Sequence, residues 1–264
     1  MAKPWEERTF AQIVQRRLSC LKQGLLYQFS PLGRASQAQL ADLKDSHRGK
    51  RCFIIGNGPS LRQTDLTRLR GEFTFGLNRI YLLFPELGFS TTYLVMINWL
   101  VMEQCADELL SQPTTKFLPW RFRNHLDQER LSNTIFIQSD CTGPVFARDA
   151  RRRLWPGATV TYVAMQLAYH MGFQKAILIG VDHSFTTQGK PHETVVSQGD
   201  DHNHFSPNYF GRGFRWQLPD LETSEIAYRL ARQAFEADGR EILDATIGGK
   251  LTVFPKVEYS SLFQ

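Results

Sequence analysis

The sequence predicts an α/β domain with a mostly parallel β-sheet that helices cover on both faces. Short apolar segments alternate with segments of helical periodicity, which is the pattern of successive βαβ units. These apolar segments are continuous and do not alternate with polar residues, as expected of strands buried on both faces. The 264 residues are 42% hydrophobic and 22% charged, a composition that supports a sizeable core and argues against disorder.

Six strands and three helices follow from these patterns. The expected strands are Arg51–Ile55, Phe73–Leu77, Tyr93–Ile97, Thr134–Gln138, Ala176–Ile179 and Glu241–Leu243. The expected helices are Val101–Leu110, Thr159–Met171 and Glu222–Ala237. Each strand is followed directly by glycine or a polar residue, whereas the helices repeat their apolar residues at three- and four-residue spacing.

The first 46 residues are predicted to form a helical extension and a linker ahead of the main domain, residues 47–264. Apolar residues recur there at helical spacing, with basic residues between them: Phe10, Ile13, Val14, Leu18, Leu21 and Leu25, with Arg8, Arg16, Arg17 and Lys22. Such a helix either packs on the main domain or lies on an anionic membrane surface. The segment Ser30–Gln39, SPLGRASQAQ, is interpreted as the linker.

Charge and cysteine content indicate the class of partner and the cellular compartment. The formal net charge of +5 favours an anionic partner, such as a nucleotide, a phosphorylated substrate or an acidic membrane. The four cysteines form no CxxC pair, which is typical of reduced thiols in a cytosol. We find neither an apolar run of about 20 residues nor a signal peptide, so we expect a cytoplasmic protein, peripheral at the inner face of the membrane if the first helix binds lipid.

The segment CFIIGNGPSL places a turn, Gly56-Asn57-Gly58-Pro59-Ser60, directly after the first strand. Ligands of parallel α/β sheets bind beyond the carboxyl ends of the strands. Glycines allow a close backbone approach, Pro59 is suited to begin a helix, and a helix N-terminus favours a phosphate. The turn matches neither GxGxxG nor a P-loop, and an ordinary tight turn is the alternative.

Asparagines follow the next two strands as well, at Asn78 and Asn98. A single asparagine in this position is usually a turn former or a helix cap. Three of them at one edge of a sheet suggest a polar surface for a ligand, because an uncharged carboxamide donates and accepts and so suits a base or a ribose.

Two later segments add titratable side chains at the same edge. The segment AILIGVDHSF ends a strand at Gly180 and is followed by Asp182 and His183. The polar segment 198–213, QGDDHNHFSPNYFGRG, is a candidate active-site loop. His202 and His204 could hold zinc with Asp201, could be surface residues without a role, or could include a catalytic base, which we prefer.

The segments IIGNGPSL, LNRIY, MIN, GVD and HNHF together resemble two related groups of proteins. One is the bacterial sialyltransferases of glycosyltransferase family 42, which have a near-identical GNGPSL turn, later asparagines, a G-I-D strand end and a histidine followed by an aromatic residue. The other is the MptE-like family, named for a 6-hydroxymethylpterin diphosphokinase, whose members include a domain of flagellin nonulosonate glycosyltransferases. The C-terminal GGKLTVFPKVEYSSLF is also similar to these proteins, and the resemblance runs roughly from Arg51 to Phe263.

The resemblance implies a Rossmann-like fold, a variant of the GT-A type, and assigns roles to individual residues. His204 would be the base that deprotonates the acceptor hydroxyl, with Asp182 and His183 as further catalytic candidates at the strand end. The donor site would contain Gly56, Asn57, Gly58, Pro59, Ser60, Asn78, Asn98, Thr159 and Thr161. The sialyltransferases also place two tyrosines soon after the G-I-D aspartate to stabilise the departing phosphate. Here that stretch is DHSFTTQGK, so Ser184, His183, Tyr209 and Arg212 are the candidate replacements.

The function implied by the resemblance is an inverting, metal-independent transfer of a nonulosonic acid such as sialic acid. The donor would be a CMP-sugar, the acceptor a cell-surface glycan precursor or a protein, and no further cofactor and no nucleic acid partner is expected. The alternative is a pyrophosphokinase that uses ATP and Mg²⁺, with Asp182, Asp200 and Asp201 as candidate metal ligands. A noncatalytic nucleotide-binding protein is the third possibility.

Overall fold

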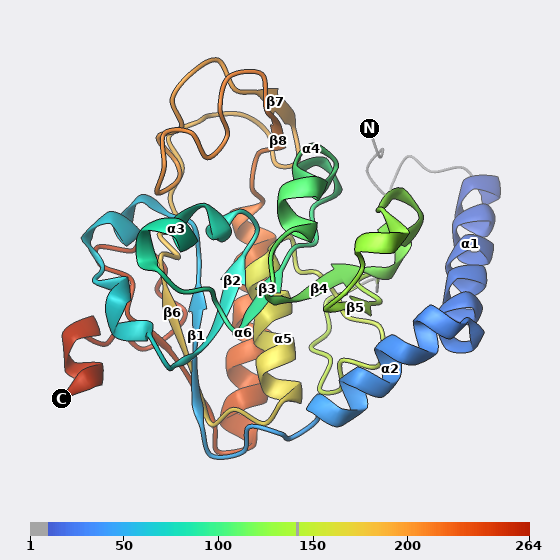
Figure 1. Ribbon diagram of the computed structural model, residues 1–264, viewed down its shortest axis with the longest axis horizontal. Helices are drawn as coiled ribbons and strands as arrows, with labels where there is room; N and C mark the ends of the chain where they lie inside the picture. The colour runs from blue at the N-terminus through green and yellow to red at the C-terminus, as the bar shows by residue number, and fades with distance from the viewer. Residues whose placement is uncertain (1–9, 141–142) are drawn as a thin grey trace.

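The computed structural model describes residues 10–140 and 143–264, and its central feature is a seven-stranded parallel sheet (Figure 1). The strand order is β5-β4-β3-β2-β1-β6-β9, and every neighbouring pair is parallel. The strands are β1 (Arg51–Ile55), β2 (Phe73–Leu77), β3 (Tyr93–Val95), β4 (Thr115–Pro119), β5 (Thr134–Ile137), β6 (Lys175–Ile179) and β9 (Glu241–Asp244). The predicted Rossmann-like α/β fold is confirmed.

Helices cover both faces of this sheet. The described residues form the α-helices α1 (Phe10–Phe29), α2 (Pro31–Leu43), α3 (Phe84–Leu87), α4 (Trp99–Leu110), α5 (Val160–His170) and α6 (Leu221–Ala237). Side chains of α2, α5 and α6 share one core with the sheet, and α4 shares the other with the 3₁₀ segments Pro59–Gln63, Leu66–Leu69, Ile80–Leu83, Trp120–His125 and Tyr259–Phe263. A further 3₁₀ turn is Gln128–Arg130. The helices predicted in the main domain are confirmed to within two residues at each end.

The strand order reverses between β1 and β6. The chain starts the sheet at β1, adds β2 to β5 on one side, and then returns to place β6 and β9 on the other side of β1. The loops after β1 and β6 therefore leave in opposite directions and open a crevice at the carboxyl edge, which is where parallel α/β sheets bind their ligands.

The sequence did not predict three strands. In β4, Lys116 is buried and its ammonium group donates to the carbonyl oxygens of Gln112 and Thr114, so a charged side chain interrupts an otherwise apolar strand. Strands β7 (Thr194–Val196) and β8 (Arg215–Gln217) pair antiparallel in a small ribbon at the top of Figure 1. This β7–β8 ribbon is short and largely exposed, so its sequence contains no apolar run from which strands could be predicted.

The interpretation of Ser30–Gln39 as a linker is wrong. These residues form most of α2, with Ser30 as the N-cap whose hydroxyl accepts from the N–H of Gly33, and with Pro31 at the first helical position. Helix α2 packs on β5: the hydroxyl of Ser36 accepts from the N–H of Phe136 at 3.1 Å, and Leu40 is buried in the core. The turn-forming residues Ser30 and Pro31 therefore begin a helix and do not form a linker. The domain boundary after residue 46 stays a prediction.

Helix α1 is confirmed, and it is attached along one side only. The hydroxyl of Tyr27 donates to the carbonyl oxygen of Phe136 at 2.9 Å, and the indole N–H of Trp120 donates to that of Gln23 at 3.1 Å. Among the described residues no helix combines the length and apolar character that a membrane crossing requires. Cys20, Cys52 and Cys105 are free thiols, and Cys141 lies outside the described residues.

Candidate functional site

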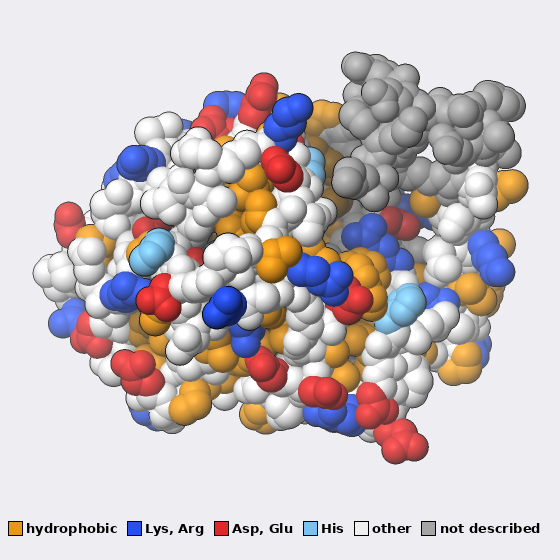
Figure 2. All heavy atoms as spheres, turned by 90° about the horizontal axis from the view of Figure 1, so that it is seen from above, with side chains coloured by type: hydrophobic (Ala, Val, Ile, Leu, Met, Phe, Trp, Pro, Cys, Tyr) orange, Lys and Arg blue, Asp and Glu red, His pale blue; other side chains and the backbone are white. Residues whose placement is uncertain are grey.

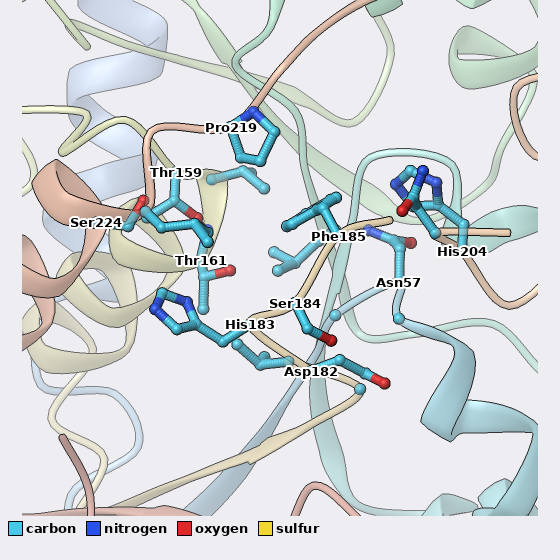
Figure 3. Close-up of a pocket in the computed structure, with 18 of the residues that line it drawn as sticks. Asn57, Thr159, Thr161, Asp182, His183, Ser184, Phe185, His204, Pro219 and Ser224 are labelled. Atoms are coloured by element: carbon cyan, nitrogen blue, oxygen red, sulfur yellow. The ribbon is translucent and has the colours of Figure 1, made fainter. Parts of the chain in front are cut away.

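A pocket of about 160 Å³ lies at the crevice between β1 and β6, and we call it the inner pocket. Its lining comes from the turns after β1, β2 and β6, from the starts of α5 and α6, and from the loop that carries His204. Figure 3 shows Thr159 and Thr161 on one side of this pocket, Asn57 and His204 on the other, and Ser184 and Phe185 between them. The structure thus brings most of the predicted site residues together, namely Gly56, Asn57, Gly58, Asn78, Thr159, Thr161, Asp182, His183, Ser184 and His204.

The turn after β1 is fixed to the turn after β6. The N–H of Gly58 donates to the carbonyl oxygen of Gly180 at 2.9 Å. The carboxylate of Asp182 accepts from the hydroxyl of Ser60 at 2.7 Å and from its N–H at 3.1 Å. A Cβ atom at Gly58 would collide with that carboxylate, which explains the glycine. Asp182 therefore holds the rim of the pocket together, and Pro59 and Ser60 build the turn without lining the pocket.

Two asparagine side chains at this edge have unused acceptors. The Oδ1 atoms of Asn57 and Asn78 are buried and have no hydrogen-bond partner within the described part of the chain. Both residues line the inner pocket, and Asn78 has a left-handed backbone with φ 49°. Because a buried acceptor without a partner costs stability, these two atoms indicate that a ligand with hydrogen-bond donors belongs here.

The third asparagine has a different job. The Oδ1 of Asn98 accepts from the N–H of Leu100 at 2.9 Å, so Asn98 is the N-cap of α4. It lines an adjoining pocket and does not reach the inner one. The helix-cap alternative thus holds for Asn98, whereas Asn57 and Asn78 share one pocket.

Helix α5 begins at the inner pocket. Thr159 is its N-cap and accepts from the N–H of Thr161, and both threonines line the pocket. The two preceding residues, Gly157 and Ala158, have left-handed backbones with φ of 56° and 58°, which turn the chain sharply into the helix. The positive end of the helix dipole therefore faces the side of the pocket where Thr159 and Thr161 lie, and an anion there is favoured.

His204 is held in place by a buried carboxylate. Its Nδ1 lies 2.7 Å from Oδ2 of Asp201, whose side chain is 4% exposed. Asp201 also accepts from the N–H groups of Asn203 and Phe210. Burial alone would raise the pKa of the Asp201 carboxyl, but the hydrogen bond and charge of His204 and the two N–H groups hold that pKa below its ordinary value.

The imidazole ring of His204 has a fixed tilt. It stacks on the ring of Tyr209 with centroids 4.1 Å apart and planes 9° apart. The neighbouring Phe205 ties this loop to the first turn, because its N–H donates to the carbonyl oxygen of Asn57 at 2.9 Å. With Nδ1 bound to Asp201, Nε2 makes no hydrogen bond to the described residues and is the atom that can take a proton from a ligand.

His183 lies on the opposite side of the inner pocket from His204. Its Nε2 is 3.2 Å from Oε1 of Glu225, and its backbone is left-handed with φ 55°. Glu225 also binds the guanidinium of Arg229 at 2.6 Å. His183 therefore shares a carboxylate that is already paired with a cation.

Two candidate replacements for the missing tyrosines line neither the inner pocket nor the pocket that adjoins it. Tyr209 is fully buried behind His204, where its hydroxyl accepts from the N–H of Arg79. Arg212 is exposed and lines neither pocket. The expectation that either one contacts a donor phosphate is not met in this geometry. Tyr228 of α6 does line the inner pocket, with its hydroxyl 3.4 Å from that of Thr159.

Within residues 10–140 and 143–264, no group of three or more His, Cys, Asp or Glu side chains is arranged to hold a metal ion. Asp182 binds Ser60, Asp201 binds His204, and Asp200 is exposed. The zinc hypothesis for the HNH segment and the carboxylate set for Mg²⁺ therefore find no ligand cluster in this arrangement.

A second cavity of about 530 Å³ adjoins the inner pocket, and we call it the outer pocket. The two share Asn78, Ala158, Thr159, Val160, Phe185, His204 and Pro219, so His204 stands at their junction. The outer pocket lies between the start of α4 and the β7–β8 ribbon, and Trp99, Arg121, His192 and Trp216 line it.

Sequence reasoning missed Tyr228 and Ser224 of α6, Asn203 beside His204, and the side chains of the outer pocket on its aromatic and ribbon walls. Tyr228 and Ser224 sit inside an amphipathic helix, where a tyrosine is indistinguishable from a core residue. Trp99 could have been found, because it directly follows the strand-end asparagine Asn98 and so lies at the same edge of the sheet.

Comparison with known proteins agrees with this architecture. The model of the family described as "6-hydroxymethylpterin diphosphokinase MptE-like" matches residues 31–188, more than half of the chain. The solved structure of the MAf glycosyltransferase from Magnetospirillum magneticum AMB-1 is similar with a TM-score of 0.51 and 15% identity, over 87% of this chain and 39% of that one. At this identity the likeness concerns the fold, and this chain spans well under half of that protein. No curated protein matched the chain in sequence.

Proposed function

Because the chain belongs to the 6-hydroxymethylpterin diphosphokinase MptE-like family, we propose that it is a transferase that binds a nucleotide-activated donor in the inner pocket, and specifically a glycosyltransferase. The observation that carries this proposal is the His204–Asp201 pair, placed at the junction of the inner and outer pockets. A base between two pockets suits a reaction in which a hydroxyl from one side attacks a donor on the other. The glycosyltransferase fold neighbour supports the same class of reaction.

The finer proposal is a CMP-activated nonulosonic acid as the donor, as the sialyltransferase resemblance implies. The unused Oδ1 acceptors of Asn57 and Asn78 suit the amino group of cytosine or the hydroxyls of ribose, which are hydrogen-bond donors. The donor phosphate then faces the N-terminus of α5, where the hydroxyls of Thr159 and Thr161 add further donors. The hydroxyl of Tyr228 stands beside them and takes the part that tyrosines have in the sialyltransferases.

In this mechanism the acceptor hydroxyl gives its proton to Nε2 of His204 while its oxygen bonds to the anomeric carbon. The bond from that carbon to the donor phosphate oxygen breaks at the same time, and the configuration at the carbon inverts. Asp201 stabilises the imidazolium that forms, and the α5 N-terminus stabilises the departing phosphate. No metal is part of this scheme.

The family's name favours a second candidate, a diphosphokinase that uses ATP and Mg²⁺. Such chemistry needs carboxylates gathered around the metal. The three candidate carboxylates are not gathered in one place. Asp182 binds Ser60 in the turn after β1, Asp201 binds His204, and Asp200 is exposed to solvent. The present arrangement does not fit that ion.

A thermal-unfolding titration tests the proposal. CMP and ATP are compared, each with Mg²⁺ and with EDTA. We expect CMP to stabilise the protein independently of Mg²⁺, by about 2.7 kcal/mol at 100 times its Kd. Stabilisation by ATP with Mg²⁺ alone would replace the proposal with the diphosphokinase, and binding without turnover of any donor would indicate a noncatalytic protein.

A matched pair of asparagine variants sharpens this test. Asn57→Ala is expected to weaken CMP binding about tenfold, since it removes one hydrogen bond, with little change in the unliganded melting temperature. Asn98→Ala should do the reverse, because it removes the α4 cap at a cost of about 1 kcal/mol and leaves the inner pocket intact. If Asn57→Ala unfolds the protein while the folded fraction binds CMP normally, Asn57 is a turn former only.

A further inference from the structure

The outer pocket has the lining of a binding site for a sugar ring. On one wall the ring of Trp99 packs on those of Phe122 and His125, with centroids 4.9 and 4.7 Å apart, and the guanidinium of Arg121 lies 4.5 Å over the ring of Phe122. The β7–β8 ribbon forms the facing wall with Trp216. A volume of about 530 Å³ is within the range of natural ligand sites, and aromatic faces with a few polar groups are their usual lining.

The charges in this pocket favour an acidic ligand. Its lining contains one carboxylate, that of Asp220, and three side chains of basic type, those of Arg121, His192 and His204. Asp220 caps α6 through the N–H of Thr223 and lies 3.3 Å from Nε2 of His192. Figure 2 shows basic and acidic side chains interspersed over this upper side of the molecule, so any selection for charge comes from the side chains that line the pocket and not from a broad basic field.

The β7–β8 ribbon is tied to the wall it faces. The side-chain amide of Gln104 on α4 accepts from the N–H of Arg215 at 2.9 Å and donates to its carbonyl oxygen at 2.8 Å. The two walls of the outer pocket are thus joined at one end and keep a fixed spacing.

We propose that the outer pocket is the acceptor subsite and that it takes a short saccharide carrying a carboxylate or another acidic group. The saccharide ring lies on Trp99, its acidic group faces Arg121, and its reacting hydroxyl points to His204. This inference rests on the proposed function, since it places the acceptor on the far side of His204 from the donor.

The test is saturation-transfer NMR with two disaccharides in the presence of saturating CMP: digalacturonic acid and its neutral counterpart galactobiose. Wild type should bind the acidic one more tightly. Trp99→Ala should weaken binding of both about tenfold, and Trp99→Phe, which keeps the packing on Phe122, should restore part of it. Arg121→Ala should remove the preference for the acidic disaccharide.

The controls are Phe29→Ala, an exposed aromatic on α1, and Arg212→Ala, an exposed arginine outside both pockets. Equal binding by wild type, Trp99→Ala and Arg121→Ala overturns the inference, as does no signal for either disaccharide. A digalacturonate signal that is present without CMP and disappears when CMP is added also overturns it, because the ligand would then occupy the inner pocket. Failure of CMP to bind would instead count against the proposed function.

A separate observation concerns α1, which exposes four apolar side chains along one face. Leu18, Leu21, Leu25 and Phe29 are 61%, 60%, 58% and 65% exposed, and their spacing of three and four residues places them on one face. The opposite side of the helix is held to the body through Gln23 and Tyr27. The expectation that the leucines pack on the main domain is therefore wrong for these residues.

The charge of α1 identifies what covers this face. The helix sequence FAQIVQRRLSCLKQGLLYQF contains three basic residues and no acidic one, and Lys22 is exposed beside Leu21. An apolar stripe with basic neighbours and no carboxylates is typical of helices that lie in the headgroup region of anionic membranes. We infer that the stripe Leu18–Leu21–Leu25–Phe29 binds an anionic bilayer surface.

Sedimentation with vesicles of phosphatidylcholine, with and without 30% phosphatidylglycerol, tests this. Wild type should bind only the anionic vesicles, and the double variant Leu21→Ser/Leu25→Ser should lose most of that binding. The matched control is Val196→Ser/Ile226→Ser, which removes exposed apolar residues elsewhere. Equal binding by both variants, or none by wild type, overturns the inference. A concentration-dependent dimer that the Leu21/Leu25 variant abolishes also does so, because the stripe is then an interface between two copies.

Discussion

Two histidine–carboxylate pairs flank the inner pocket, and they differ in how the carboxylate is supported. In the His204–Asp201 pair the carboxylate is buried, receives two further backbone N–H groups and pairs with no other cation among the described residues. In the His183–Glu225 pair the carboxylate is 35% exposed and shares its charge with Arg229. A buried and otherwise uncompensated carboxylate stabilises an imidazolium far more than one that is hydrated and paired.

The comparison indicates that a histidine beside a pocket is suited to act as a base when a buried carboxylate and a stacked ring support its imidazole. His204 has a fixed ring plane, set by Tyr209, and a fixed orientation, set by Asp201. His183 has neither a stacked ring nor a dedicated carboxylate. The predictions below test whether this difference in support is a difference in function.

The largest effect is expected at His204. His204→Ala should lower the transfer rate by about 10²- to 10⁴-fold, the usual contribution of a general base, while CMP binding is retained. The measurement is steady-state turnover of the donor that the CMP and ATP titration identifies. His202→Ala is the control, because His202 is exposed in the same loop and lines neither pocket. Near-wild-type turnover by His204→Ala would remove it from the mechanism.

Asp201 is a positioning residue, and its variant should be next in effect. Asp201→Asn keeps the shape of the side chain and removes the charge, so we expect the rate to fall about 10- to 100-fold. A positioning role predicts that this loss appears in kcat while CMP binding stays close to that of wild type. A slower enzyme that has lost CMP binding to the same extent would mean that Asp201 matters for folding only.

The Asp201 carboxylate should also affect how the stability of the folded protein depends on pH in acid. Its pKa is lowered in the folded protein, so the unfolded chain binds more protons as the pH falls. The stabilisation is complete above the unfolded value of about 3.9 and is lost as the pH falls through the folded pKa. Melting temperatures of Asp201→Asn should therefore decline less steeply than those of wild type from about pH 5 to about pH 3. Parallel curves would contradict this account.

The smallest effect is expected at Glu225. Glu225→Gln should change turnover by less than about threefold, since the carboxylate is partly hydrated and already paired. The same assay as for Asp201→Asn gives a direct contrast between the two pairs. A loss at Glu225 as large as that at Asp201 would reverse the assignment and make His183 the base.

Much of the fold could be predicted because periodicity reports burial. The parallel strands from β1 to β6 are short apolar runs ended by polar residues, and α5 and α6 carry regular apolar repeats. The exceptions are cases where local chemistry hides the pattern: the buried lysine in β4, the Ser-Pro start of α2, and the exposed β7–β8 ribbon.

The topology of the sheet predicts the site residues that sit at strand ends, whereas Thr159, Thr161 and His204 were assigned by the family resemblance. Asn57, Asn78, Asp182 and His183 follow strands, so the topology alone brings them to one edge. The role of Asn98 and the separation of Tyr209 from the pockets depend on where single side chains point, which strand order does not determine. Tyr228 enters the pocket because α6 packs beside α5, a tertiary contact that no local pattern reports.

Gln104 joins the two walls of the outer pocket, α4 and the β7–β8 ribbon, in an unusual way. Its carboxamide makes with the backbone of Arg215 the same two hydrogen bonds, one given and one received, that a neighbouring strand would make. A single side chain on α4 thus completes the outer edge of the β7–β8 ribbon. Together with the ion pair between Arg215 and Glu103, whose charged atoms lie 3.4 Å apart, this side chain sets the distance between the two walls of the outer pocket.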